Sequence, residues 1–308
     1  MPRRLALLAG LLAATVLASP VAAITNGQPD GGDHPYVGQL FFYVPDYDDT
    51  RFTDPGGYFN CSGTLVSPTV VVTAGHCTFG IGLDGKPTTA TGGSGGNDVW
   101  VNFDEAPSYD GLPPSSDYIP DENAQRYIDR VAWLSTQPAW HRGTAHPHPQ
   151  YDDAAFFLYD LGIVVLDEPV TLPAGYSYAT LPSPRYLDRY RSAPRDTQRF
   201  TPVGYGLEKV LPGRDFGGDT RRVAEVKLNT LNSNPRDTYA VFSNNNGNAH
   251  KGGTCFGDSG GPIFDGTSNR IVAVTSFGIS PNCTGIGGGY RLDQPDDLTF
   301  LAGFGVTP

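Results

Sequence analysis

Short apolar runs separated by turn residues recur along the whole chain. They lie at 36–43, 63–66, 70–72 and 270–274. Runs of this length, rich in β-branched and aromatic residues and bounded by glycine, proline and polar residues, are typical of β-strands. The 39 glycines and 27 prolines fit the many turns that such a pattern needs. The pattern therefore predicts an all-β fold.

Helical periodicity is scarce. The best candidate helix runs from Asp296 to about Phe304, near the C-terminal end. Two stretches in the first half of the chain, 91–96 and 104–121, are rich in residues that favour turns, and we expect them to be surface-loop insertions. A proline-rich stretch at 181–185 is expected to connect two halves of the molecule.

The first 23 residues have the composition of an export signal. Arg3 and Arg4 precede an apolar stretch at 5–17, and small residues follow up to Ala23. This arrangement predicts a cleavable signal peptide at 1–23 and a secreted, extracellular protein. Because no second apolar run of about 18 residues follows, we expect no membrane span.

The rest of the chain is acidic. Without the two arginines of the signal segment it has 19 basic and 32 acidic residues, a net charge of −13. Binding to nucleic acid or to anionic membranes is driven by clustered lysine and arginine, which this sequence does not show. The composition therefore argues against both as partners.

Ser259 lies among small residues in the run Cys-Phe-Gly-Asp-Ser-Gly-Gly-Pro at 255–262. The same letters match G-x-S-x-G, the nucleophile turn of the α/β-hydrolases, in which the triad histidine follows the serine. The last histidine of this chain is His250, so that alternative fails. Candidate partners lie upstream of the serine, in the order histidine, aspartate, serine.

His76 and Asp160 are the candidate partners. A serine hydroxyl needs a base within hydrogen-bond reach, and His76 is the only histidine set in a suitable motif, Thr-Ala-Gly-His-Cys at 73–77. Asp160 precedes an apolar run that would bury it, as expected of a carboxylate that orients an imidazole. Asp152 and Asp153 are the alternatives, but they precede a pair of phenylalanines instead of such a run.

These three motifs, in this order, resemble those of the secreted trypsin-like serine proteases, which have the chymotrypsin fold. The resemblance extends from residue 24 to about residue 291. It implies an all-β protein with two antiparallel six-stranded β-barrels of the chymotrypsin type and a short C-terminal helix. The protease domain would span 24–308, with the first barrel at about 24–181 and the second at about 186–308.

The resemblance also implies an endopeptidase that hydrolyses protein or peptide substrates without a cofactor or a metal ion. Ser259 would attack the scissile carbonyl, His76 would transfer the proton, and Asp160 would orient His76. The backbone N–H groups of Gly257 and Ser259 would form the oxyanion hole. Protein inhibitors would be further partners of such a cleft.

Five residues are expected to bind the substrate. By the resemblance, Ser276, Phe277 and Gly278 pair with an extended peptide as an added strand. Gly253 and Thr254 lie where the resemblance places the floor of the P1 pocket, and neither is charged. We therefore expect apolar or aromatic P1 residues to be preferred over lysine and arginine, because a buried cation would lack a partner.

Signal cleavage after Ala23 would create a new N-terminus at Ile24. In the family, the freed α-amino group pairs with the carboxylate just before the nucleophile, which is Asp258 in this sequence. We therefore expect Ile24 and Asp258 to form an activation pair, and signal cleavage alone to produce the active enzyme.

Four cysteines in an exported chain are expected to be paired, and arithmetic alone leaves three connectivities open. The resemblance selects Cys61 with Cys77, beside the predicted base, and Cys255 with Cys283, beside the predicted nucleophile.

Some alternatives stay open at this level. The complete triad argues against an inactive binding protein on a protease scaffold, and the strand-like segment at Ser276 argues against an esterase that uses the same triad. His146 and His148 are weak candidates for metal ligands, because closely spaced histidines in a proline-rich loop are more often surface residues. For the insertions between His76 and Asp160, a role in substrate selection is the alternative to plain solvated loops.

Overall fold

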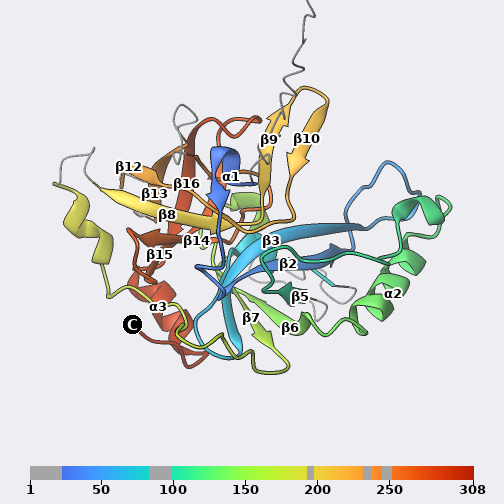
Figure 1. The fold of residues 1–308 in the computed structure, drawn as a ribbon, viewed down its shortest axis with the longest axis horizontal. Coiled ribbons are helices and arrows are strands. Elements are labelled where there is room, and N and C mark those ends of the chain that lie inside the picture. Colours follow the sequence, from blue (N-terminus) through green and yellow to red (C-terminus); the bar gives the residue numbers. More distant parts are fainter. Residues whose placement is uncertain (1–22, 83–98, 193–197, 232–237, 245–251) are drawn as a thin grey trace, which may run out of the picture.

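The computed structural model describes residues 23–82, 99–192, 198–231, 238–244 and 252–308 (Figure 1). The predicted signal peptide, apart from Ala23, and the stretch at 91–96 lie outside these residues. Among the described residues, no helix has both the length and the apolar composition that crossing a membrane requires. Most of the regular structure is antiparallel β-sheet.

The first barrel is a closed ring of six strands, in the order β2, β3, β4, β7, β6, β5. The strands are β2 (Val37–Val44), β3 (Gly57–Leu65), β4 (Val70–Thr73), β5 (Val99–Asn102), β6 (Trp140–Pro147) and β7 (Gly162–Leu166). Leu40, Val72 and Ile163 on these strands are fully buried and belong to one apolar core. The apolar runs of the sequence thus form the interior of the barrel.

The second barrel is also a ring of six strands, because β14 pairs back with β8. Its strands are β8 (Arg199–Gly204), β12 (Val226–Thr230), β13 (Tyr239–Asn244), β14 (Pro262–Asp265), β15 (Ile271–Gly278) and β16 (Gly285–Arg291). Beside β8, the sheet is extended by β11 (Arg222–Val223) and β1 (Gln28–Pro29), while β9 (Leu207–Leu211) and β10 (Arg214–Gly217) form a separate hairpin. The two barrels confirm the predicted fold class.

The described helices are few and short. They are α1 (Ala23–Asn26), α2 (Asn123–Leu134), α3 (Pro295–Ala302) and the 3₁₀ turns η1 (Gly75–Cys77), η2 (Ser115–Asp117), η3 (Asp153–Ala155) and η4 (Tyr186–Tyr190). The C-terminal helix α3 is the one expected from Asp296, and in Figure 1 it lies close to the C-terminus of the chain. α1 is a single turn in which Ile24 and Thr25 have non-helical dihedral angles.

Helix α2 lies in the long segment between His76 and Asp160. The sequence analysis predicted surface loops in this segment and did not predict the helix. Its buried positions follow helical spacing and are Asn123, Arg126, Tyr127, Arg130 and Leu134. Three of these side chains are amide or guanidinium groups, whereas Ile128 is exposed. Apolar periodicity is the signal that identifies a helix in a sequence, so a helix that buries a polar face escapes it.

Candidate active site

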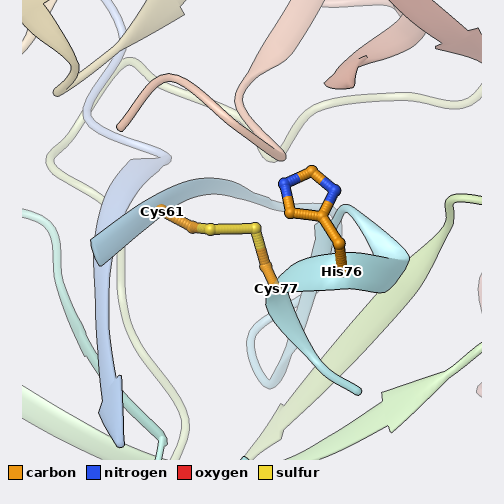
Figure 2. A group of neighbouring side chains, drawn as sticks. All are labelled: Cys61, His76 and Cys77. Atoms are coloured by element: carbon orange, nitrogen blue, oxygen red, sulfur yellow. A yellow bond between two sulfur atoms is a disulfide. The ribbon is translucent and has the colours of Figure 1, made fainter. Parts of the chain in front are cut away.

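His76 lies on the turn η1, directly after strand β4 of the first barrel. A disulfide joins Cys61 on β3 to Cys77 on this turn, and Figure 2 shows the His76 ring beside the bridge. Donor atoms of these three residues lie within 4.8 Å of one another. Sulfur atoms in a disulfide are not the thiolates that bind metal ions, so the bridge acts as a brace for the histidine turn.

Asp160 is fully buried and accepts hydrogen bonds from three groups. His76 Nδ1 lies 3.0 Å from both carboxylate oxygens, and the His76 backbone N–H donates to Oδ1 at 2.9 Å. The Ser276 hydroxyl donates to Oδ2 at 2.6 Å. Because a carboxylate only accepts, these contacts assign the proton of a neutral His76 ring to Nδ1 and leave Nε2 free as a base. The alternatives Asp152 and Asp153 make local hydrogen bonds within their own loop.

The charge of Asp160 controls the protonation of His76. Burial by itself lowers the pKa of the His76 ring, but the negative charge of Asp160, the hydrogen bond to it and, as a smaller contribution, the charge of Asp153 outweigh this effect. The pKa of His76 therefore lies above the usual 6.5.

A proton acceptor must be neutral, so activity should be present above the pKa of His76 and lost as the pH falls through it. We expect the acidic limb of kcat/KM, measured between about pH 5 and pH 9, to have its midpoint above the ~6.5 of a free imidazole. A flat profile, or a midpoint well below that value, would contradict the role of His76 as the base.

Ser259 precedes strand β14 of the second barrel and is partly exposed. Its carbonyl oxygen accepts the backbone N–H of Ser62 at 2.7 Å, which ties this turn to β3. Ser259 and His76 line the same cavity. Among the described residues, no hydrogen bond joins the Ser259 hydroxyl to the His76 ring, and such bonds are often long in substrate-free enzymes.

The peptide group between Phe256 and Gly257 is held in one orientation. The Leu207 N–H donates to the Phe256 carbonyl oxygen at 2.7 Å. The C=O and N–H of a trans peptide point in opposite directions, so the Gly257 N–H faces away from Leu207. Gly257 has a φ of +96°, and an added Cβ would lie 2.9 Å from Gly206 Cα. Only glycine fits this position, from which Gly257 borders the same cavity as Ser259.

Ser62 is a functional candidate that sequence reasoning missed. Its buried hydroxyl donates to the Gly257 carbonyl oxygen at 2.9 Å and accepts the Tyr205 N–H at 3.0 Å. Together with its N–H contact to Ser259, Ser62 thus holds both residues of the predicted oxyanion hole. A lone serine after a cysteine carries no motif, so no sequence signal marks this role.

Replacing Ser62 by alanine should lower kcat by about tenfold with little change in KM, because two buried backbone groups next to the oxyanion hole would lose their partner. The measurement is steady-state kinetics together with thermal unfolding. Ser67→Ala is the matched control, since the Ser67 hydroxyl accepts from turn amides before β4. An equal fall in kcat for both variants would show that Ser62 acts only through stability.

Asp258 is a buried carboxylate held by two backbone donors. The N–H of Gly206 and the N–H of Cys255 each donate to it at 2.8 Å. Burial raises the pKa of Asp258 to about 7, although the two hydrogen bonds lower it. Burial therefore disfavours the charged form of this carboxyl group.

Ile24 is fully buried at the second barrel, where α1 packs against β9. The next residue, Thr25, forms an antiparallel bridge with Gly253, and its hydroxyl donates to the Gly253 carbonyl oxygen at 3.0 Å. Gly253 belongs to the segment that leads to Asp258. The two members of the predicted activation pair thus both lie buried in this part of the molecule.

A cavity of about 240 Å³ opens on one side of Ser259. The predicted substrate-binding residues Thr254, Ser276, Phe277 and Gly278 line it, and the disulfide between Cys255 and Cys283 forms part of its wall. None of the described residues that line this cavity is charged. That this cavity is the P1 pocket stays a prediction from the sequence.

Gly253 does not line this cavity but packs behind it. An added Cβ would lie 2.3 Å from Asn244 Cγ. Asn244 is buried and its amide donates to the Thr254 carbonyl oxygen at 3.0 Å, so it supports the pocket from below. Sequence reasoning missed Asn244 because a single asparagine on a strand has no distinguishing pattern.

His146 and His148 make separate aromatic contacts. The His146 ring lies 5.1 Å from the Phe304 ring, and the His148 ring is stacked on Tyr159 at 4.9 Å. Burial lowers the pKa of His148 to about 4. Both histidines therefore contribute to packing near α3.

Comparisons with known proteins agree on one family. A sequence model described as trypsin matches residues 129–292, more than half of the chain. A trypsin of Saccharopolyspora erythraea is 24% identical over 236 residues, covering 73% of this chain and 78% of that protein. Serine protease 1 of Drosophila melanogaster is 25% identical over 269 residues, covering 84% and 77%.

Solved structures with low sequence identity share the fold. HL collagenase aligns with a TM-score of 0.60 at 16% identity, covering 92% of this chain and 100% of that chain. Human heparin binding protein aligns with a TM-score of 0.53 at 16% identity, covering 91% and 96%.

Proposed function

The chain belongs to the trypsin family of serine proteases, and on this basis we propose that it is a secreted serine endopeptidase. One observation carries the proposal: the buried Asp160 carboxylate accepts from His76 Nδ1, which leaves Nε2 as a base beside the cavity that contains Ser259. In the proposed triad Ser259 is the nucleophile, His76 the general base and Asp160 the orienting acid.

The proposed reaction proceeds through an acyl-enzyme. Ser259 Oγ attacks the scissile carbonyl while its proton moves to His76 Nε2. The N–H groups of Gly257 and Ser259 stabilise the oxygen anion that forms, and a single donor of this kind contributes about 3 kcal/mol in comparable enzymes. His76 then donates the proton to the leaving amine, and water hydrolyses the acyl-enzyme by the same steps in reverse.

Binding of an extended peptide is supported by strand β15. Its last residues, Ser276, Phe277 and Gly278, line the smaller cavity beside Ser259. A peptide that pairs with this segment as an added strand would carry its P1 side chain into that cavity. We assign the protease domain to 24–308, with the first barrel within about 24–181 and the second within about 186–308.

Activation is proposed to follow signal cleavage after Ala23. A new α-amino group at Ile24 would provide a cation for Asp258, whose pKa is raised to about 7 by burial. A nearby cation stabilises the carboxylate and lowers that pKa, so pairing would favour the ordered nucleophile turn. N-terminal sequencing of the secreted protein tests this step. A start upstream of Ile24 in fully active protein would contradict it.

The neutral lining of the smaller cavity leads to a prediction about P1. A chromogenic peptide with phenylalanine at P1 should have a kcat/KM at least about tenfold higher than the same peptide with arginine, because the guanidinium would be buried without a counter-charge. Peptides that differ only at P1 provide the measurement. Comparable turnover of the two would overturn the proposed preference.

The proposed function is tested by the turnover of a peptide and an ester that carry the same acyl part and leaving groups of matched basicity. A serine endopeptidase should cleave both, and mass spectrometry should find internal cuts in an unfolded protein substrate. Ester hydrolysis without peptide cleavage would indicate an esterase. No turnover by protein that begins at Ile24 would indicate a binding protein on the protease fold.

A further inference from the structure

A second and larger cavity, of about 600 Å³, lies on the other side of Ser259. It shares only Phe256 and Ser259 with the described lining of the smaller cavity. Its walls are mostly apolar and include Phe42, Val44, Tyr47, Phe59, Leu207 and Phe256. Its volume is within the range of pockets that bind ligands in proteins, roughly 300 to 1,000 Å³.

The position of this cavity decides what can occupy it. A peptide whose P1 side chain enters the smaller cavity must pass over Ser259 on its way out of the site. His76 and Gly257 line the larger cavity together with Ser259, so the chain beyond the scissile bond runs into it. The residues of the leaving group are therefore its occupants.

The first wall of the cavity is the β2–β3 hairpin, which helix α2 supports from behind. Phe42 pairs with Phe59 across the two strands, and both face the cavity. The neighbouring pair, Tyr43 and Tyr58, points to the opposite face of the hairpin because side chains alternate along a strand. There the Tyr43 ring lies 4.8 Å from the ring of Tyr127 on α2.

Cations of α2 strengthen this support. The guanidinium carbon of Arg130 lies 4.8 Å from the centre of the Tyr58 ring, and that of Arg126 lies 4.3 Å from the centre of the Phe52 ring. The Tyr58 hydroxyl donates to the Tyr127 carbonyl oxygen at 3.1 Å. Such contacts between cations and aromatic faces are favourable, most of all where water is excluded.

The second wall is formed by the β9–β10 hairpin and is held by the same insertion. The Gln39 amide on β2 donates to the Gly218 carbonyl oxygen at 3.1 Å, and the Tyr109 hydroxyl donates to Gln39 Oε1 at 2.8 Å. Gly218 and Asp219 line the cavity, and Asp219 is exposed at its rim. Because residues between His76 and Asp160 fix both walls, the cavity is formed before a substrate binds.

We propose that this cavity selects a bulky apolar or aromatic side chain at one of the first two positions after the scissile bond. The proposal rests on the proposed endopeptidase activity and adds a second determinant of specificity to it. Acidic residues at these positions are disfavoured by Asp219, which is the only carboxylate among the described residues of the lining. The insertion between His76 and Asp160 then has a role in substrate selection.

The test uses fluorogenic peptides with one common acyl part and with phenylalanine, alanine or glutamate at each of the first two positions after the scissile bond. We expect kcat/KM to be about tenfold to a hundredfold higher for phenylalanine than for alanine at one of these positions, and lowest for glutamate. A substrate with the same acyl part and an aminocoumarin leaving group reports the hydrolytic activity by itself.

Two leucine variants on the same strand assign the preference to the cavity. Leu207→Ala removes part of the apolar wall and so enlarges the cavity. It should reduce the ratio of phenylalanine to alanine turnover by about fivefold. Leu211→Ala is the matched control, because Leu211 is 40% exposed on β9 and lies outside the described lining. It should leave the ratio unchanged.

The outcomes separate this inference from the proposed function. Hydrolysis of the aminocoumarin substrate with equal turnover of all leaving groups would overturn the inference and leave the endopeptidase proposal standing. A ratio of phenylalanine to alanine turnover that is unchanged in Leu207→Ala, or that falls equally in Leu211→Ala, would also overturn it. No hydrolysis of any substrate by protein that begins at Ile24 would reject both.

Discussion

Ser259→Ala is expected to lower kcat by about a million-fold, the loss seen when the nucleophile of a comparable triad is removed. The physical reason is that Ser259 is the only serine or threonine among the described residues that line the cavity of His76. A fluorophosphonate, which reacts covalently with an activated serine, should add one label to the wild type and none to the variant. Intact mass spectrometry measures both.

The matched control is Ser268→Ala, which removes an exposed serine from the turn after β14. This variant should be labelled and active like the wild type. Labelling of Ser259→Ala would place the reactive serine elsewhere. No adduct on wild-type protein confirmed to begin at Ile24 would indicate an occluded or inactive scaffold.

Asp160→Asn should lower kcat by about ten-thousand-fold, as for the same change in a comparable triad. Asp160 accepts from His76 Nδ1, the His76 backbone N–H and the Ser276 hydroxyl. An asparagine has an NH₂ group in place of one carboxylate oxygen, so at least one of these contacts would bring two hydrogen-bond donors together. The neutral His76 ring would lose the acceptor that keeps its proton on Nδ1, and Nε2 would no longer be the base.

Steady-state kinetics and thermal unfolding should be measured for Asp160→Asn and for Asp153→Asn. Asp153 is exposed and bonds within its own loop, so its variant should keep kcat within about threefold of the wild type, as usual for surface substitutions. If Asp160→Asn kept more than a tenth of the activity, Asp160 would not be the residue that orients His76.

The strands of both barrels could be predicted because their signal is local. The runs at 36–43 and 70–72 form parts of β2 and β4, since apolar residues at this density fold into a buried sheet in almost any antiparallel context. The run at 270–274 forms the first half of β15 in the same way. Helix α2 has no such signal, because its stability comes from packing against aromatic residues of the β2–β3 hairpin. These residues lie beside the helix only in the folded chain.

The residues of the candidate site differ in the same way, since some have a local sequence signal and others do not. His76, Asp160 and Ser259 could be predicted as a triad because each stands in a recognisable motif, and their order along the chain argued against the α/β-hydrolases. The supporting residues Ser62 and Asn244 have no motif. Each acts through a side chain that donates to a backbone carbonyl oxygen in the segment at 254–257, and such contacts are set by the fold.

By itself, the sequence determined the fold class, the family resemblance and the candidate residues for the chemistry, because strand patterning and short motifs are local properties. Only the tertiary structure decided which groups touch: that Ser276 shares Asp160 with His76, and that Ser62 holds the Gly257 peptide. It also decided that the insertion supports the larger cavity beside Ser259. The reason is that such contacts join residues far apart in the chain, and their distances depend on how the two barrels and their hairpins pack.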